Sequence, residues 1–99
     1  MTGNYIPISS WAEDDKPREK MLSKGVTALS TNELLAILIR SGSGGESALD
    51  LSRRILTDAS NDLNTLARLS VSDFMNRYKG VGMAKAASII AAMELGRRR

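Results

Sequence analysis

The 99-residue sequence contains no cysteine and no histidine, and these two absences exclude several classes of chemistry. Without cysteine there are no disulfides and no thiolate nucleophiles, and without histidine there is no imidazole base and little basis for a zinc site. The acidic run at Glu13, Asp14 and Asp15 lacks the glycine-turned ligand spacing of a calcium loop. We therefore expect no enzymatic activity, no cofactor and no metal.

Aromatic residues are also scarce, at 4% of the chain against 42% for hydrophobic residues as a whole. The core must then come from aliphatic side chains and methionine packed between helices. No apolar run reaches the length needed to cross a membrane, and the N-terminus lacks a basic-then-apolar signal pattern. We expect a cytoplasmic protein.

Charge is divided unevenly along the sequence. Residues 1–50 hold five basic and seven acidic side chains, a net charge of −2, whereas residues 51–99 hold nine basic and four acidic ones, a net charge of +5. A basic half of this kind is typical of a protein that binds a polyanion, and a solvated basic face explains it nearly as well.

Apolar residues recur at helical spacing, and no segment alternates with a period of two for long, so we predict an all-α fold of five to six short helices. Residues 1–12 are interpreted as an extended arm, followed by a short helix with Pro17 in its first turn. Ser30 and Glu33 have the spacing of a capping box before the most apolar segment. Further helices are predicted through Ala48 to Leu56, over 63–69, from Ser70 or Ser72, and after Gly82.

Two halves of the chain resemble each other. Leu29-Ser30 recurs forty residues later as Leu69-Ser70, and the glycine pair Gly42-x-Gly44 recurs thirty-eight residues later as Gly80-x-Gly82. Each half has the order cap, helix, Gly-x-Gly, helix. We predict a tandem, pseudo-duplicated helix-hairpin-helix domain over 13–99, with units at about 29–57 and 69–97.

The second glycine pair lies in the basic half, where a helix N-terminus can bind a phosphate through its free amides and its dipole. Glycines there would allow positive φ and the close approach of an anion, and Val81 would point inward and fix the turn. The predicted DNA-binding residues are Lys79, Gly80, Val81, Gly82, Met83, Ala84 and Lys85. A purely structural turn between two helices is the alternative at this point.

The first glycine pair is a weaker candidate, because Glu46 and Asp50 follow it and would complement the next helix themselves. Secondary DNA contacts are predicted for Arg40, Gly42, Gly44, Arg97 and Arg98. The two C-terminal arginines also suit an ordinary basic helix end. Trp11 is interpreted as an anchor for the N-terminal arm.

Three segments carry a family resemblance: "KPREKML" (Lys16 to Leu22), "ALSTNELLAILIRSG" (Ala28 to Gly42) and "KGVGMAKA" (Lys79 to Ala86). Together they resemble the N-terminal domain of the bacterial RadC family. The resemblance implies a role in DNA repair or processing, with this domain as the DNA-binding part. Many relatives have proline at Met83, so the hairpin here is expected to be less rigid, with one more amide to donate.

Relatives in that family usually continue into a JAB/MPN metalloprotease-like domain with histidine and aspartate ligands. The absence of histidine indicates that this second domain is absent, so the chain is expected to be an excised domain or a truncated relative. The leading hypothesis is a non-catalytic module that binds DNA without sequence preference. The alternative is a protein-interaction module that docks the C-terminal domain, a second copy or a repair partner.

Overall fold

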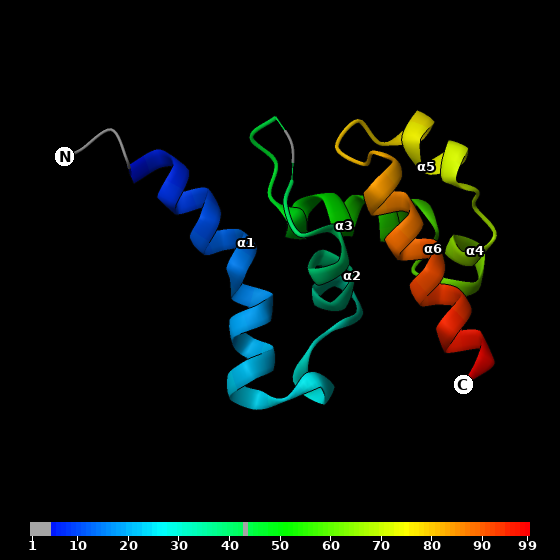
Figure 1. Ribbon diagram of the computed structural model, residues 1–99. Coiled ribbons are helices and arrows are strands. Elements are labelled where there is room, and N and C mark those ends of the chain that lie inside the picture. Colours follow the sequence, from blue (N-terminus) through cyan, green and yellow to red (C-terminus); the bar gives the residue numbers. More distant parts are fainter. Residues whose placement is uncertain (1–4, 43) are drawn as a thin grey trace.

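The computed structural model describes residues 5–42 and 44–99, with side chains described from residue 14 onward. These ranges contain six α-helices, one short 3-10 helix and no strand, which confirms the all-α prediction (Figure 1). None of the described helices is long and apolar enough to span a membrane. The elements are α1 (Tyr5–Lys24), η1 (Val26–Ala28), α2 (Thr31–Ile39), α3 (Ala48–Asp58), α4 (Leu63–Ala67), α5 (Val71–Arg77) and α6 (Met83–Arg98).

Helix α1 corrects the predicted extended arm, because the backbone is already helical from Tyr5. Pro7 is the third residue of α1, where its missing N–H removes no intrahelical hydrogen bond, so it does not prevent an early start. Pro17 lies inside α1 rather than in its first turn, and it is buried. Residues 1–4 of the predicted arm, and the side chain of Trp11, lie outside the described residues.

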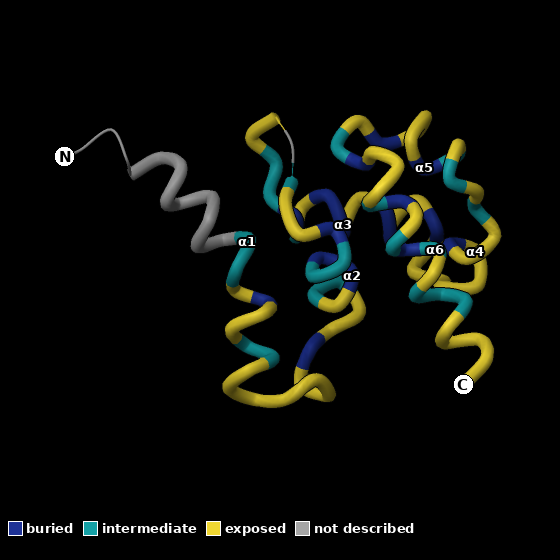
Figure 2. Tube along the Cα trace, viewed as in Figure 1, coloured by how far each residue is buried: buried dark blue, intermediate teal, exposed yellow. Residues whose placement is uncertain are grey.

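Helix α2 is the centre of the packing and contacts α1, α3 and α6. Its apolar face is buried through Leu35, Ala36 and Ile39, as the hydrophobicity of this segment predicted. Figure 2 shows that the buried residues lie along α2, α3, α5 and α6. The core is mainly aliphatic, with two aromatic residues, Phe74 and Tyr78, at its α5 side.

The helix starts confirm the capping signals in the sequence. Ser30 Oγ accepts a hydrogen bond from the Glu33 amide at 3.1 Å, and the Glu33 carboxylate accepts one from the Ser30 amide at 2.9 Å. Ser70 and Asp73 form the same reciprocal pair at the start of α5, at 3.1 and 2.9 Å. The cap of α5 is therefore Ser70 and not Ser72, and both helices have matching start signals forty residues apart.

The loop between α2 and α3 and the loop between α5 and α6 lie at the same edge of the molecule (Figure 1). A hydrogen bond from Lys85 to Ser41 joins the two loops directly. The helix pairs α2–α3 and α5–α6 fall on the two halves aligned from the sequence. The bounds of these units as repeats stay a prediction.

Candidate nucleic-acid interface

The turn between α5 and α6 is fixed by two buried side chains. Tyr78 and Val81 are each 2% exposed, and the Val81 amide donates to the Tyr78 carbonyl oxygen at 3.0 Å. Val81 therefore packs inward, as predicted from its place between the glycines. Since its amide is used inside the turn, Val81 contributes packing to this region rather than a donor for an anion.

The predicted positive φ at Gly80 and Gly82 is wrong. Gly82 has φ −87° and ψ −173°, and the positive φ values among the described glycines fall at Gly25, Gly44 and Gly45. The chain reverses here through extended backbone at Tyr78 and Gly82, closed by the Tyr78 carbonyl. A left-handed residue is not needed for such a turn.

A lack of room for a side chain does not explain Gly82 either. A Cβ built on Gly82 would have no atom within 4 Å, and the residue is exposed. Neither the backbone conformation nor the packing of the described residues requires glycine at this position. What glycine provides here is an open approach to the N-terminus of α6.

That N-terminus differs from those of the preceding helices. Side-chain oxygens cap α2, α3, α4 and α5, whereas no side chain of the described residues caps α6 at Gly82. The first turn of α6 has no acidic residue, while α2, α3 and α5 each have one. The amides of Met83, Ala84 and Lys85 belong to this first turn and have no acceptor within the helix. They form the positive end of a 16-residue helix dipole.

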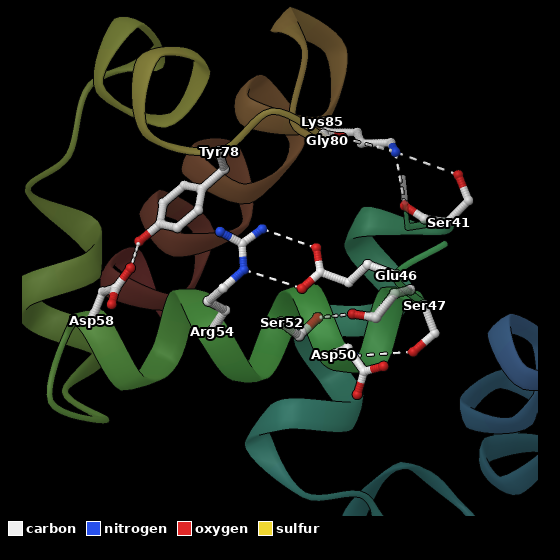
Figure 3. A network of polar contacts seen from close by, with 11 residues as sticks. Ser41, Glu46, Ser47, Asp50, Ser52, Arg54, Asp58, Tyr78, Gly80 and Lys85 are labelled. Carbon is white, nitrogen blue, oxygen red and sulfur yellow. Dashed lines mark hydrogen bonds and ion pairs between the residues drawn. The ribbon is translucent and has the colours of Figure 1, made fainter. Parts of the chain in front are cut away.

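The two flanking lysines have different surroundings. Lys79 is exposed on the turn. Lys85 lies on the first turn of α6, and its Nζ donates to the carbonyl oxygens of Ser41 at 2.8 Å and Gly80 at 3.2 Å (Figure 3). Lys85 therefore binds two backbone carbonyl groups and bridges the two loops, while Lys79 presents its charge to solvent.

In the loop between α2 and α3, the fold itself requires the glycines. A Cβ on Gly42 would overlap the carbonyl oxygen of Glu46, so close backbone contact requires glycine there. Gly44 has φ 60°, a left-handed conformation that favours glycine. The fold of the chain itself thus accounts for both glycines of this pair, in contrast to Gly82.

The N-terminus of α3 is already occupied by protein groups. Asp14 of α1 accepts a hydrogen bond from the Ala48 amide at 2.7 Å, and Ser47 Oγ accepts one from the Asp50 amide at 3.1 Å. The sequence predicted that Glu46 and Asp50 would complement this helix end. Asp50 does lie in the first turn of α3, and the structure adds Asp14 from 34 positions away, which no local signal in the sequence indicated.

Arg40 lies at the end of α2 in an unusual conformation. Its φ is 72° and its ψ −49°, and the Ser41 amide donates to the Ile39 carbonyl oxygen at 2.9 Å across it. These values describe a γ-turn, which is a strained arrangement for a residue with a side chain. The exposed Arg40 lines a hollow of about 320 Å³ together with Asp14, Asp15, Arg18 and Ser41. It therefore lies among mixed charges rather than in a basic patch.

A polar network fastens the second turn to α3 (Figure 3). The Tyr78 hydroxyl donates to Asp58 Oδ2 at 2.7 Å, and the Arg54 guanidinium lies 5.6 Å from the centre of the Tyr78 ring. Arg54 also makes two hydrogen bonds to the Glu46 carboxylate, at 2.9 and 3.1 Å, and these raise the pKa of Arg54. Burial, followed by the Asp58 bond, raises the pKa of Tyr78 to about 12. Sequence reasoning missed this network because its members come from three separate segments.

The C-terminal arginines lie far from the α6 N-terminus. Arg97 is fifteen positions beyond Gly82, or about 22 Å along a helix axis at 1.5 Å per residue. Both Arg97 and Arg98 bind the Glu94 carboxylate, with contacts of 2.7 Å, and these bonds lower the pKa of Glu94 to about 2. These two arginines therefore form a separate, internally paired cluster.

Among the described residues, no group of three or more acidic, histidine or cysteine side chains is placed to hold a metal ion. The candidate interface is thus a set of backbone amides with one exposed cation, Lys79, and one bridging cation, Lys85. Such a set can bind an anion but offers no nucleophile or base of its own.

Comparison with known proteins gives consistent matches along the chain. A family model described as UPF0758 N-terminal matches residues 8–87. A UPF0758 protein of Flavobacterium johnsoniae is 58% identical over 98 residues, which cover 99% of this chain and 42% of that protein. A UPF0758 protein of Trichlorobacter lovleyi is 46% identical over 93 residues, covering 92% of this chain and 40% of that protein. The chain spans less than half the length of the curated relatives it matches. No solved structure matches it significantly.

Proposed function

Since the chain belongs to the UPF0758 family, which is the RadC-like family, we propose that it is a non-catalytic module that binds the phosphate backbone of DNA. The binding surface is the N-terminus of α6 with the turn before it, residues 79–85. We place this activity in bacterial DNA repair or processing, in the cytoplasm. The names of these relatives state no function, so the proposal depends on the geometry of this surface.

The observation that carries the proposal is the uncapped start of α6. Four other helices receive a side-chain cap, and α6 receives none although it is preceded by a well-packed turn. Gly82 is not required by backbone conformation or by space within the chain. A phosphate seated at this end would accept hydrogen bonds from the first-turn amides and meet no Cβ at Gly82.

The same geometry favours contacts that do not depend on base sequence. Amides at a helix N-terminus recognise phosphate oxygens, which are the same at every nucleotide. Lys79 adds an exposed positive charge that DNA can approach. Lys85 contributes mainly by holding the neighbouring loop in place.

The decisive variant is Gly82→Asp, which gives α6 the cap it lacks. Aspartate is a preferred N-cap, so the fold should be as stable as before or slightly more stable. Its carboxylate would occupy the amides and repel a phosphate, and the loss of charge-assisted bonds predicts roughly a tenfold to hundredfold weaker binding. Affinity for a short duplex and for a single strand of the same sequence would be measured by fluorescence anisotropy, over salt concentrations from about 50 to 200 mM.

Ser47→Asp is the matched control, because it places the same charge at the N-cap of α3, where a side chain already caps the helix. We expect Ser47→Asp to reduce the affinity much less than Gly82→Asp does. A second, unrelated duplex sequence should bind equally well. The proposal fails if the unmodified chain binds neither form of DNA at low salt, or if the folded Gly82→Asp variant binds as tightly as the parent.

A further inference from the structure

A second surface feature lies on the side of α6 that faces α4. An open groove of about 510 Å³ lies between the two helices. Its apolar lining includes Leu63 and Ala67 from α4 and Ile90 and Met93 from α6. Met93 is eleven positions beyond Gly82, about 16 Å along the helix axis. The groove is therefore separate from the proposed DNA surface and does not depend on it.

The groove brings together several apolar side chains that are exposed or only partly buried. Leu63 is 44% exposed, and Ala67 is exposed as well, on a helix of only five residues. Ile90 and Met93 pack against the core from one side and remain only partly buried. The volume lies within the range of sites that accept several side chains of a partner or a small ligand.

The rim of the groove is polar, with its acidic group paired to basic ones. Glu94 and Arg97 both line it, and the Glu94 carboxylate is bound by Arg97 and Arg98. One carboxylate shared by two guanidinium groups leaves this cluster with a net charge of +1, so the rim does not favour a strongly basic occupant. An apolar segment with a polar border fits this surface best.

The place of the groove in the chain indicates which segment this is. The groove is formed by the C-terminal half of α6, which runs to Arg98 of a 99-residue chain. The matched relatives are more than twice as long, because the chain covers only 42% of the F. johnsoniae protein, and the matching model describes an N-terminal region. In a protein that continues beyond α6, the next segment would begin beside the groove and be tethered there at a high effective concentration, which favours its docking.

We propose that the α4–α6 groove is the docking site for the part of the longer UPF0758 protein that follows this region. The linkage would then fix the orientation of the remaining protein relative to the α5–α6 turn. Apolar side chains of the following segment would contact Leu63, Ala67 and Met93, while the Glu94 cluster would stay at the solvent border.

The test compares hydrogen exchange in two proteins. One is the 99-residue chain, and the other is the same chain continued by the part of the F. johnsoniae relative beyond the matched region. In the longer protein, amides of α4 and of residues 90–97 should exchange at least about tenfold more slowly, because docking stabilises both helices against local opening. Continuing the chain could by itself reduce fraying at the end of α6, so the protection of α4 is the more telling signal.

Leu63→Glu in the longer protein should remove the protection of both segments, because it places a charge in the apolar lining. Met75→Glu is the matched control, since Met75 on α5 is also 44% exposed but does not line the groove, and it should leave the protection intact. The proposal is overturned if α4 exchanges equally in both proteins or if protection survives Leu63→Glu. It is equally overturned if the 99-residue chain forms dimers that Leu63→Glu abolishes, because a second copy would then occupy the groove.

Discussion

The ammonium of Lys85 connects the two glycine loops, since its Nζ lies 2.8 Å from the carbonyl oxygen of Ser41 and 3.2 Å from that of Gly80. Ser41 lies 44 positions before Lys85 in the sequence, and Gly80 lies five positions before it. One side chain on α6 therefore sets the distance between the α2–α3 loop and the α5–α6 turn. This gives Lys85 a structural role that its neighbour Lys79 does not share.

Replacing each lysine by methionine should separate these roles. Lys85→Met should lower the free energy of unfolding by about 1 kcal/mol, because two charge-assisted hydrogen bonds to backbone carbonyls are lost at a partly exposed site. Lys79→Met should leave the stability within about 0.5 kcal/mol of the parent, as expected for an exposed side chain. Urea denaturation of the two variants measures the difference.

The salt dependence of DNA binding gives the complementary readout for Lys79. If this lysine contacts one phosphate of a duplex, Lys79→Met should reduce the slope of log affinity against log salt by about 0.9. An unchanged slope would show that Lys79 does not contact DNA. A larger loss of stability in Lys79→Met than in Lys85→Met would contradict the assigned roles.

Asp14 is expected to stabilise the start of α3 from a distance. Asp14→Ala removes the acceptor for the Ala48 amide and should cost about 1 kcal/mol of unfolding free energy, as the loss of a helix cap typically does. Asp15→Ala is the control, because among the described residues Asp15 makes one surface ion pair, with Arg18, and its loss should cost less than about 0.5 kcal/mol. Equal effects of the two substitutions in chemical denaturation would argue against the cap.

The two glycine pairs should respond oppositely to alanine. Gly42→Ala places a methyl group onto the Glu46 carbonyl, so the backbone must move, and we expect a loss of at least about 3 kcal/mol. Gly82→Ala places the methyl group in open space at a negative φ, and its cost should stay within about 1 kcal/mol. Thermal unfolding followed by circular dichroism distinguishes the outcomes. Comparable losses at both positions would mean that Gly82 serves the fold after all.

Local signals made much of this fold predictable. The capping box at Ser30 and Glu33, the cap at Ser70 and the inward turn at Val81 all involve residues within three positions of their partners or fixed by a short turn. No comparable local signal pointed to Asp14, because its bond to Ala48 depends on how α1 lies against α3. The early start of α1 was missed because the apolar residues of the first twelve positions show no helical period.

The candidate site was predicted only in outline. Its residues are adjacent in the sequence, so their grouping followed from the glycine pattern, but the conformation of the glycines did not. Whether Lys85 faces solvent or Ser41 depends on a loop 44 positions away. Contacts of this kind require the packed arrangement and cannot be obtained from spacing.

Tyr78 should give the protein a measurable loss of stability in alkali. Its pKa is raised from 10.0 to about 12 in the folded state, first by burial and then by the hydrogen bond to Asp58. The folded state therefore holds this proton more tightly than the unfolded state does. The corresponding stability is complete below about pH 10 and decreases as the pH rises from 10 toward 12, by an amount on the order of 2 kcal/mol.

Tyr78→Phe removes this titration and should flatten that part of the stability curve, after an initial loss of about 1 kcal/mol from the missing hydrogen bond at neutral pH. Urea unfolding at a series of alkaline pH values, together with the ultraviolet absorbance of tyrosinate, measures both effects. A variant whose stability decreases between pH 10 and 12 as steeply as that of the parent would refute the assignment to Tyr78.

The γ-turn at Arg40 makes the α2–α3 hairpin depend on the rest of the domain more than the α5–α6 hairpin does. An isolated peptide spanning α2 to α3 would have to hold a non-glycine residue at φ 72° without Lys85 and Asp14, both of which lie outside that segment. The α5–α6 hairpin has its own capping box and a turn free of positive φ values. In another helical scaffold, the α5–α6 hairpin should keep its conformation. The α2–α3 hairpin should lose its conformation, because it depends on contacts within the assembled domain.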